Sequence, residues 1–209
     1  MGFENEKKTF LAKLDKSKKG SIDTKIIPLL TLFNDHKHYY TTSSCSGRVY
    51  LWKGTGKKNE TEWINVSHDF ITNSFFNIRI EPETGLKTER GTERATVWLR
   101  VEPSILHVAC RDIPSANTLL EQAQRVYKKS CILSASNKII VELRGSEFME
   151  MPLYNDGTLL ISDIDLLTIL VNKKMESIFQ SIEKLAAKIK KELNLKKNKL
   201  KKRIVVSFI

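Results

Sequence analysis

Tyr39-Tyr40-Thr41-Thr42-Ser43-Ser44-Cys45-Ser46-Gly47-Arg48 is the stretch of sequence that says most about the fold. Its aromatic residues and threonines favour a β-strand, and the small residues after them favour a turn. Small side chains let a ligand approach the backbone closely, and hydroxyls and free N–H groups can hold a carboxylate or a phosphate. Arg48 adds a planar fork of donors for the same anions. The run predicts a strand that ends in a ligand-binding turn.

Outward from this run, hydrophobic periodicity and turn signals predict the other elements. Helices are expected at residues 3–14, 22–33, 69–76, 114–128 and from Ser162 onward, and strands at residues 39–44, 48–52, 62–67, 96–102, 105–110, 131–135, 138–144, 148–152 and 204–209. Residues 53–61 and 81–94 are expected to be loops. Runs of strands with helices to one side favour an α+β fold. No Gly-x-Gly-x-x-Gly follows a strand, which disfavours a dinucleotide-binding fold of the Rossmann type.

The two halves of the chain have similar patterns. Each offers a helix, two strands with a small polar turn between them, a third strand and another helix, and the run Ser44–Val49 has a loose counterpart in residues 134–139. We therefore expect one domain over residues 1–209, with an internal β/α duplication of two pseudo-repeats at about 1–94 and 95–193. Residues 194–209 would form a basic C-terminal tail.

The charge of the chain is concentrated near its end. The net charge is +11, and residues 183–203 contain ten Lys or Arg and two acids, a net charge of +8. Such a segment is typical of a chain that binds a polyanion, or of a solvated helix end. No apolar run approaches the ~20 residues that span a membrane. The sequence also shows no signal-peptide apolar region, so a cytoplasmic protein with reduced cysteines is expected.

Candidate chemical groups cluster at strand ends. His68 ends a predicted strand, and His107 lies inside an apolar strand that continues to Cys110 and Arg111. His107 and Cys110 have the spacing of two metal ligands, but no second close pair exists, so no metal is expected. A polar patch precedes the first strand and contains Lys13, Lys18, Lys19, Ser21 and Asp23. Its lysines suit phosphate, and Asp23 is either a helix cap or an acid.

Four motifs in this order resemble one family. They are residues 14–23 (Leu-Asp-Lys-Ser-Lys-Lys-Gly-Ser-Ile-Asp), residues 39–48, Trp63 with Ser67-His68, and residues 102–111 (Glu-Pro-x-x-Leu-His-Val-x-Cys-Arg). Together they resemble the tRNA wybutosine-synthesizing protein 3 family, and the similarity extends from about Phe3 to Lys184.

The resemblance implies an S-adenosylmethionine-dependent methyltransferase. Its acceptor would be ring nitrogen N-4 of the 7-aminocarboxypropyl-demethylwyosine intermediate of phenylalanine tRNA, beside the anticodon. The implied fold is α+β, with a barrel-like, mainly antiparallel or mixed sheet, flanking helices and a β/α duplication. It is not a Rossmann-type methyltransferase fold. The basic segment beyond Lys184 lies outside the shared motifs, so its tRNA role rests on charge alone.

Methyl transfer to a ring nitrogen requires a proton acceptor, for which His68 and Asp23 are candidates. The cofactor-binding residues would be Ser43, Ser44, Cys45, Ser46, Gly47, Arg48, His107, Cys110 and Arg111, where Cys45 is equally well explained as a small buried residue. The residues that contact tRNA would be Lys13, Lys18, Lys19 and Ser21. The main alternative is a non-catalytic RNA-binding protein that uses its basic C-terminal segment. A cysteine-dependent hydrolase built on Cys45 is a weaker alternative, because no Cys-His-Asn pattern is present.

Overall fold

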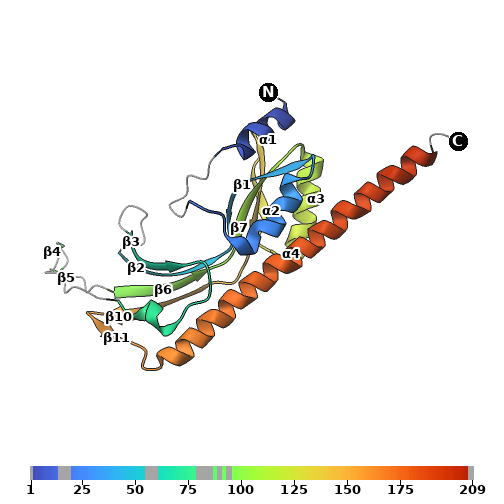
Figure 1. The fold of residues 1–209 in the computed structure, drawn as a ribbon. Coiled ribbons are helices and arrows are strands. Elements are labelled where there is room, and N and C mark those ends of the chain that lie inside the picture. Colours follow the sequence, from blue (N-terminus) through green and yellow to red (C-terminus); the bar gives the residue numbers. More distant parts are fainter. Residues whose placement is uncertain are drawn as a thin grey trace. The chain divides into compact units, whose positions relative to one another are not determined.

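The structure is a computed structural model (Figure 1). It describes residues 2–13, 20–54, 61–78, 87–88, 91–92 and 96–206. Side chains are described in the same ranges, except at residues 87–88, 91–92 and 194–206. The helices are α1 (Phe3–Leu11), α2 (Ile27–Asn34), α3 (Ile113–Gln124) and α4 (Ile164–Val206), with short 3₁₀ helices at Thr24–Ile26 and Asn73–Phe76. The strands are β1 (Tyr39–Cys45), β2 (Arg48–Gly54), β3 (Thr61–Ser67), β4 (Lys87–Thr88), β5 (Gly91–Thr92), β6 (Thr96–Glu102), β7 (Ile105–Cys110), β8 (Cys131–Ser134), β9 (Ile139–Arg144), β10 (Met149–Asn155) and β11 (Thr158–Leu159).

The chain divides into two compact units. The first unit consists of Met1–Ser46, Ser104–Ser146 and Phe179–Ile209, and the second of Gly47–Pro103 and Glu147–Ile178. Both units therefore take strands from both halves of the sequence, and helix α4 begins in the second unit and ends in the first. In the described part of the chain, no helix combines the length and the apolar composition needed to cross a membrane.

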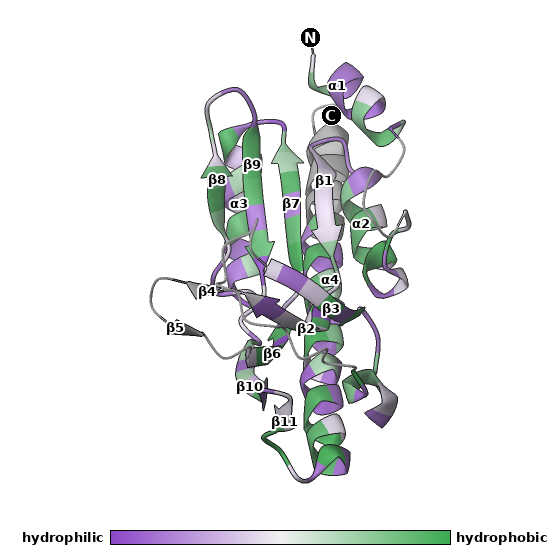
Figure 2. Cartoon of the chain, turned by 90° about the vertical axis from the view of Figure 1, so that its left-hand side faces the viewer, coloured by the Kyte–Doolittle hydropathy of each residue, from purple (hydrophilic) through white to green (hydrophobic). Residues whose placement is uncertain are grey.

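The first unit is built on an antiparallel sheet with the strand order β1-β7-β9-β8. Figure 2 shows β7 and β9 as mostly hydrophobic, whereas β1 is pale because Thr and Ser have intermediate hydropathy. Strand β7 has a partner on each side, so its residues fix the positions of β1 and β9 at once. Strands β1 and β8 are the edges of the sheet.

Helix α2 packs on β1, and α3 packs on β7, β8 and β9; Figure 2 shows α3 behind the strands and α2 beside β1. The buried side chains between sheet and helices are apolar and close-packed. They are Leu29, Leu30 and Phe33 of α2, Leu106 and Val108 of β7, Ala116, Leu119 and Ala123 of α3, Val141 and Leu143 of β9, and Ile182, Leu185 and Ile189 of α4.

A β-bulge in β1 decides which face its hydroxyl groups occupy. Thr41 lies opposite Val108, and Ser43 lies opposite His107, so Thr42 is an extra residue in β1. A bulge of this kind shifts the alternation of side chains by one position. As a result, Ser43 lies on the same side as His107, away from the buried Leu106 and Val108. Helix α1 packs near the other end of β1, where the Phe3 and Phe10 rings are 5.4 and 5.6 Å from the Tyr40 ring.

The second unit is built on an antiparallel sheet with the order β11-β10-β6-β2-β3. One face buries Val49 and Leu51 of β2, Val97, Leu99 and Val101 of β6, and Leu153 of β10. In the same unit α4 buries Leu167, Val171, Met175 and Ile178. The segment after β3 is tied to α4, because the Ile71 N–H donates to Asn172 Oδ1 and the Asn172 Nδ2 donates to the Ile71 carbonyl, both at 2.9 Å.

Most predicted elements are confirmed, since the predicted ranges overlap the observed ones closely. The apolar stripe of α4 is buried at 167, 171, 175, 178, 182, 185 and 189. The α+β class is confirmed as well. The barrel-like sheet is wrong for the described strands, which form two main antiparallel sheets instead of a closed barrel. The reason lies at Ser46 and Gly47, where the chain leaves the first sheet, so that β1 and β2 do not pair.

Four local predictions are corrected. The helix expected at residues 22–33 is divided into a 3₁₀ helix, Thr24–Ile26, and α2, which begins at Ile27. Pro28 explains the division, because a proline inside a helix clashes with the carbonyl four residues before it and is tolerated only in the first turn. Residues 69–72 are not helical. Residues 87–88 and 91–92 pair as strands. Residues 204–206 continue α4 instead of forming a strand, because propagating an existing helix outweighs the β-propensity of Ile and Val. Residues 207–209 lie outside the described residues.

We expect Asp112→Ala to lower the free energy of unfolding by about 1 kcal/mol. Asp112 is the N-cap of α3, and its Oδ1 accepts from the Ser115 N–H at 2.8 Å. The hydrogen bonds from Ser115 lower the Asp112 pKa, so this contribution is present at neutral pH and is lost as the pH falls below the ordinary value of 3.8. Urea unfolding at pH 7 and pH 3 measures it. Asp112→Ser keeps a capping hydroxyl and should lose less stability. If Asp112→Ala lowered the free energy of unfolding equally at both pH values, the ionised Asp112 carboxylate would not be the cap.

Candidate active site

The turn after β1 is held by a buried carboxylate. Asp23 Oδ2 accepts from the Ser46 N–H at 2.9 Å and from the Ser46 Oγ at 3.0 Å. Asp23 is 8% exposed and Ser46 is fully buried. Gly47 follows with a φ of 99°, in the region that favours glycine. Asp23 thus fixes the backbone at the end of β1. It precedes the 3₁₀ helix Thr24–Ile26 as its N-cap residue, but its side chain makes no capping hydrogen bond there. Its role as a proton acceptor stays a prediction.

Three polar side chains form a hydrogen-bonded row across the first sheet. Ser43 of β1 lies opposite His107 of β7, which lies opposite Glu142 of β9. Ser43 Oγ is 2.9 Å from His107 Nδ1, and His107 Nε2 is 3.0 Å from Glu142 Oε2. The Thr42 hydroxyl donates to the His107 carbonyl at 3.2 Å. Ser43 is exposed, whereas the side chains of His107 and Glu142 are 29% and 16% exposed.

Ser44 and Cys45 complete the end of β1. Ser44 is exposed and lies opposite Leu106, and Cys45 is half-buried and lies opposite Ile105. The pairing therefore places Ser43, Cys45 and His107 on one face of the first sheet, whereas Ser44 lies on the face of Leu106. Whether they contact a cofactor stays a prediction.

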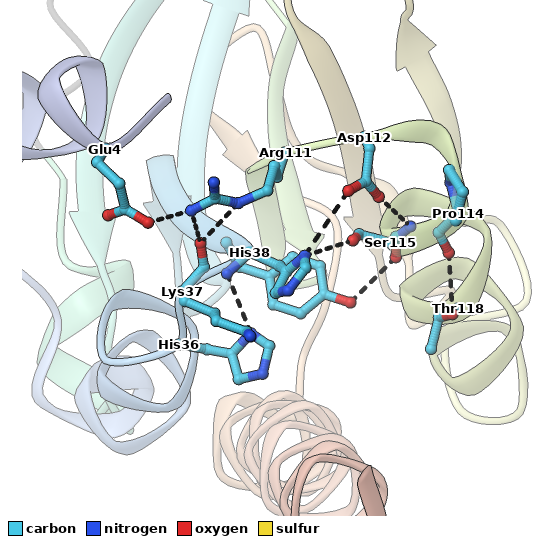
Figure 3. Close-up of polar contacts among 10 residues, drawn as sticks. Glu4, His36, Lys37, His38, Arg111, Asp112, Pro114, Ser115 and Thr118 are labelled. Atoms are coloured by element: carbon cyan, nitrogen blue, oxygen red, sulfur yellow. Dashed lines mark hydrogen bonds and ion pairs between the residues drawn. The ribbon is translucent and has the colours of Figure 1, made fainter. Parts of the chain in front are cut away.

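Cys110 and Arg111 follow His107 in the chain but serve the packing of the first unit. The Cys110 thiol is buried, and this burial, with the nearby Asp112 carboxylate, raises its pKa to about 12. Figure 3 shows the Arg111 guanidinium between the Glu4 carboxylate and the Lys37 carbonyl, to which its Nη2 donates at 2.7 Å. These partners explain both residues structurally, and their predicted contact with a cofactor stays a prediction.

The same close-up explains how β1 begins beside α3. His38 Nδ1 lies 2.9 Å from Ser115 Oγ and 3.8 Å from Asp112 Oδ2 (Figure 3). The Tyr39 hydroxyl donates to the Ser115 carbonyl at 3.0 Å. The first turn of α3 therefore anchors the start of β1.

Arg48 lies in the second unit, on the sheet face opposite Val49 and Leu51. Its Nε and Nη2 donate to Glu102 Oε2 at 2.9 and 2.7 Å, and its guanidinium carbon is 4.3 Å from the Trp63 ring centroid. The Tyr50 ring stacks on Trp63 at 4.8 Å, and its hydroxyl donates to Glu102 Oε1 at 2.8 Å. An anion that binds Arg48 would therefore have to share the guanidinium with Glu102.

The remaining candidates lie on other segments of the chain. Lys13 is exposed and its Nζ is 5.3 Å from the Phe10 ring centroid, and Ser21 is exposed. Lys18 and Lys19 lie outside the described residues. His68, half-buried, follows β3 in the second unit. An open pocket of about 390 Å³ is lined by residues that precede and follow His68 in the sequence, including Asn65, Ser67 and Phe75.

Glu142 and Glu102 are not among the site residues predicted from the sequence, although Glu102 begins the motif at residues 102–111. Glu142 lies inside β9 and Glu102 is the last residue of β6, and each lies opposite a predicted site residue. An acid inside a strand or at its end is the signal that was available, but only the strand pairing shows which guanidinium or imidazole it meets.

Comparisons with known proteins agree with this fold. Residues 5–191 match the family described as Methyltransferase TYW3. A protein of Thermococcus sibiricus named tRNA(Phe) 7-((3-amino-3-carboxypropyl)-4-demethylwyosine(37)-N(4))-methyltransferase is 33% identical over 196 residues, which cover 90% of this chain and 95% of the relative. A protein of Methanocaldococcus jannaschii with the same name is 35% identical over 170 residues, covering 78% of this chain and 83% of the relative. The solved structure of PH1069 from Pyrococcus horikoshii has a TM-score of 0.74 and 30% identity, and covers 90% of this chain and 96% of that chain.

The fold and these matches define the class of protein, a methyltransferase with an α+β architecture. The chain belongs to the Methyltransferase TYW3 family. The family expected from the sequence motifs is confirmed.

We expect Asp23→Ala to lower the free energy of unfolding by about 2 kcal/mol, because the Ser46 N–H and hydroxyl would stay buried without this acceptor. Asp23→Asn keeps an acceptor oxygen at the same reach and should lose less. Urea unfolding measures both variants against Ser136→Ala, a substitution in the exposed turn between β8 and β9. An Asp23→Ala variant as stable as the wild type would show that the two hydrogen bonds do not hold this turn.

Proposed function

We propose that this chain transfers a methyl group from S-adenosylmethionine to ring nitrogen N-4 of 7-aminocarboxypropyl-demethylwyosine in phenylalanine tRNA. The observation that carries the proposal is family membership over residues 5–191, together with relatives of this stated activity that are similar along most of their length. The reaction belongs to wyosine and wybutosine biosynthesis.

The residues at the end of β1 suit the polar groups of the methyl donor. Ser43 and Ser44 present exposed hydroxyls there, and the glycine after Ser46 has a φ that side chains rarely adopt. The Asp23 hydrogen bonds hold the backbone of Ser46 in place before any ligand binds, which lowers the entropy that binding must overcome. Small hydroxyl residues on a fixed backbone fit the carboxylate and hydroxyl groups of S-adenosylmethionine. We therefore propose that the backbone turn at Ser46 and Gly47, with the exposed hydroxyl of Ser44 before it, holds the donor.

S-Adenosylmethionine supplies a methyl group on a sulfonium sulfur, so transfer breaks a carbon–sulfur bond, leaves a neutral thioether and forms a carbon–nitrogen bond. The chain has to orient the acceptor nitrogen, exclude water and receive the proton that this nitrogen loses. Positioning supplies a large part of the rate in such a reaction. Tyr39, Arg111 and Asp112 contribute indirectly, because their contacts anchor the two strands that carry the site.

The tRNA partner is proposed from charge as well as from family. Ten Lys or Arg among residues 183–203 provide a large electrostatic attraction to phosphates, and α4 presents this segment as a continuous helix up to Val206. Lys13, Lys18, Lys19 and Ser21 are proposed as further contacts.

We expect purified protein to methylate phenylalanine tRNA that carries the demethylated intermediate. Incubation with S-adenosylmethionine bearing a deuterated methyl group, followed by nucleoside digestion and mass spectrometry, detects the product. The label should appear on the tricyclic base at N-4 and not on other nucleosides, and tRNA lacking the intermediate is the control. Tight tRNA binding without any label would contradict methyl transfer and support a non-catalytic RNA-binding protein.

A further inference from the structure

We propose that Ser43, His107 and Glu142 form a proton relay that receives the proton lost by the acceptor nitrogen. This inference rests on the proposed methyl transfer and names the groups that handle its proton. It differs from the expectation that His68 or Asp23 is the proton acceptor and that His107 binds the cofactor.

The hydrogen-bond partners decide the tautomer of His107. An ionised carboxylate only accepts hydrogen bonds, so His107 Nε2, at 3.0 Å from Glu142 Oε2, carries the proton of the neutral ring. His107 Nδ1 then has the lone pair and accepts from the Ser43 hydroxyl at 2.9 Å. Both ring nitrogens are thus in hydrogen bonds, and the outermost group of the row is Ser43 Oγ.

The exposure of the three side chains gives the relay a direction. Ser43 is exposed, and a hydroxyl that donates its proton to His107 can still accept a hydrogen bond from an incoming N–H group. Glu142 is the least exposed of the three side chains, at 16%, so its charge acts on the imidazole with little screening by water. The row therefore has an accepting oxygen at its outer end and a fixed negative charge at its inner end.

The proton balance is complete within these three residues. As the nitrogen uses its electron pair to bond to the methyl carbon, its proton passes to Ser43 Oγ, and the original Ser43 proton passes to His107 Nδ1. His107 becomes an imidazolium, and the Glu142 carboxylate stabilises it without itself being protonated. The positive charge that the sulfonium loses appears on His107, so the total charge is unchanged. His107 returns its proton to solvent when the product leaves.

The backbone is built to hold this geometry. The bulge at Thr42 places Ser43 on the His107 side of the sheet, and the Thr42 hydroxyl donates to the His107 carbonyl. Glu142 and His107 are direct partners in the register of β7 and β9, inside a sheet whose other face is packed by helices. The distance between side chains on paired strands varies little, and a proton relay requires such constant distances between its groups.

The kinetic test compares Ser43→Ala, His107→Gln and Glu142→Gln with the wild type and with Glu121→Gln, a substitution on the exposed surface of α3. We expect kcat to fall about 10²-fold or more for the first two variants and roughly tenfold for Glu142→Gln, while the KM for tRNA stays near that of the wild type. Glu142→Asp should recover part of the loss. Variants that change only KM, or that keep the wild-type kcat, would overturn the relay.

A second measurement does not need activity. Nitrogen-15 NMR of the imidazole rings reports which nitrogen carries the proton, and the chain has four histidines, so His107→Gln assigns the His107 signal. We expect the Nε2–H tautomer in the wild type and in Ser43→Ala, and a mixture of tautomers in Glu142→Gln. A wild-type ring in the Nδ1–H form would overturn the relay even if methyl transfer is found. Absence of methyl transfer by the wild type would instead refute the proposed function, and the ring measurement would still decide whether the hydrogen-bonded row exists.

Discussion

The register of β7 between β1 and β9 is the constraint on which the site depends. Its residues pair with both neighbours, so a slip of one residue would turn His107 into the packed face and expose Leu106. The buried Leu106, Val108 and Leu143 make that slip unfavourable, because their apolar surface would meet water. Burial of the hydrophobic face of β7 therefore fixes the position of His107 on the opposite, polar face. The bulge at Thr42 places Ser43 on that polar face.

The second unit shows how a cation-rich sheet face is kept in order. Arg48 and Tyr50 share the Glu102 carboxylate, and Arg100 donates to Tyr50 at 3.1 Å and to Glu150 at 2.6 Å. Burial and the Glu102 carboxylate raise the Tyr50 pKa to about 12, so Tyr50 stays neutral and keeps its hydroxyl proton for Glu102 at physiological pH. Each guanidinium is held by a carboxylate and an aromatic ring, which fixes its plane. An RNA phosphate or base that reaches this face would meet groups that are already ordered.

Much of the fold could be predicted from the sequence, because the spacing of hydrophobic residues indicates which side chains of a helix or strand are buried. The stripe of α4 and the alternation in β6 and β7 show which side chains face the core. The two-sheet architecture could not be predicted, since nothing in Ser46 and Gly47 indicates that the strands on either side of them belong to different sheets. Ser43, Cys45 and His107, which come from two of the sequence motifs, do lie on one face of the first sheet. The partners of Arg48 and His107 depend on strand register, and register is a property of the whole sheet.

We propose that the donor binds at the end of β1, beside His107. The direct measurement is an amide NMR titration of isotope-labelled protein with S-adenosylmethionine. We expect the largest shifts at residues 43–47 and at 106–107, and we expect them to saturate with a 1:1 stoichiometry. Shifts gathered instead around Asn65 to Phe75, with residues 43–47 unchanged, would contradict the account and place the donor in the pocket of the second unit.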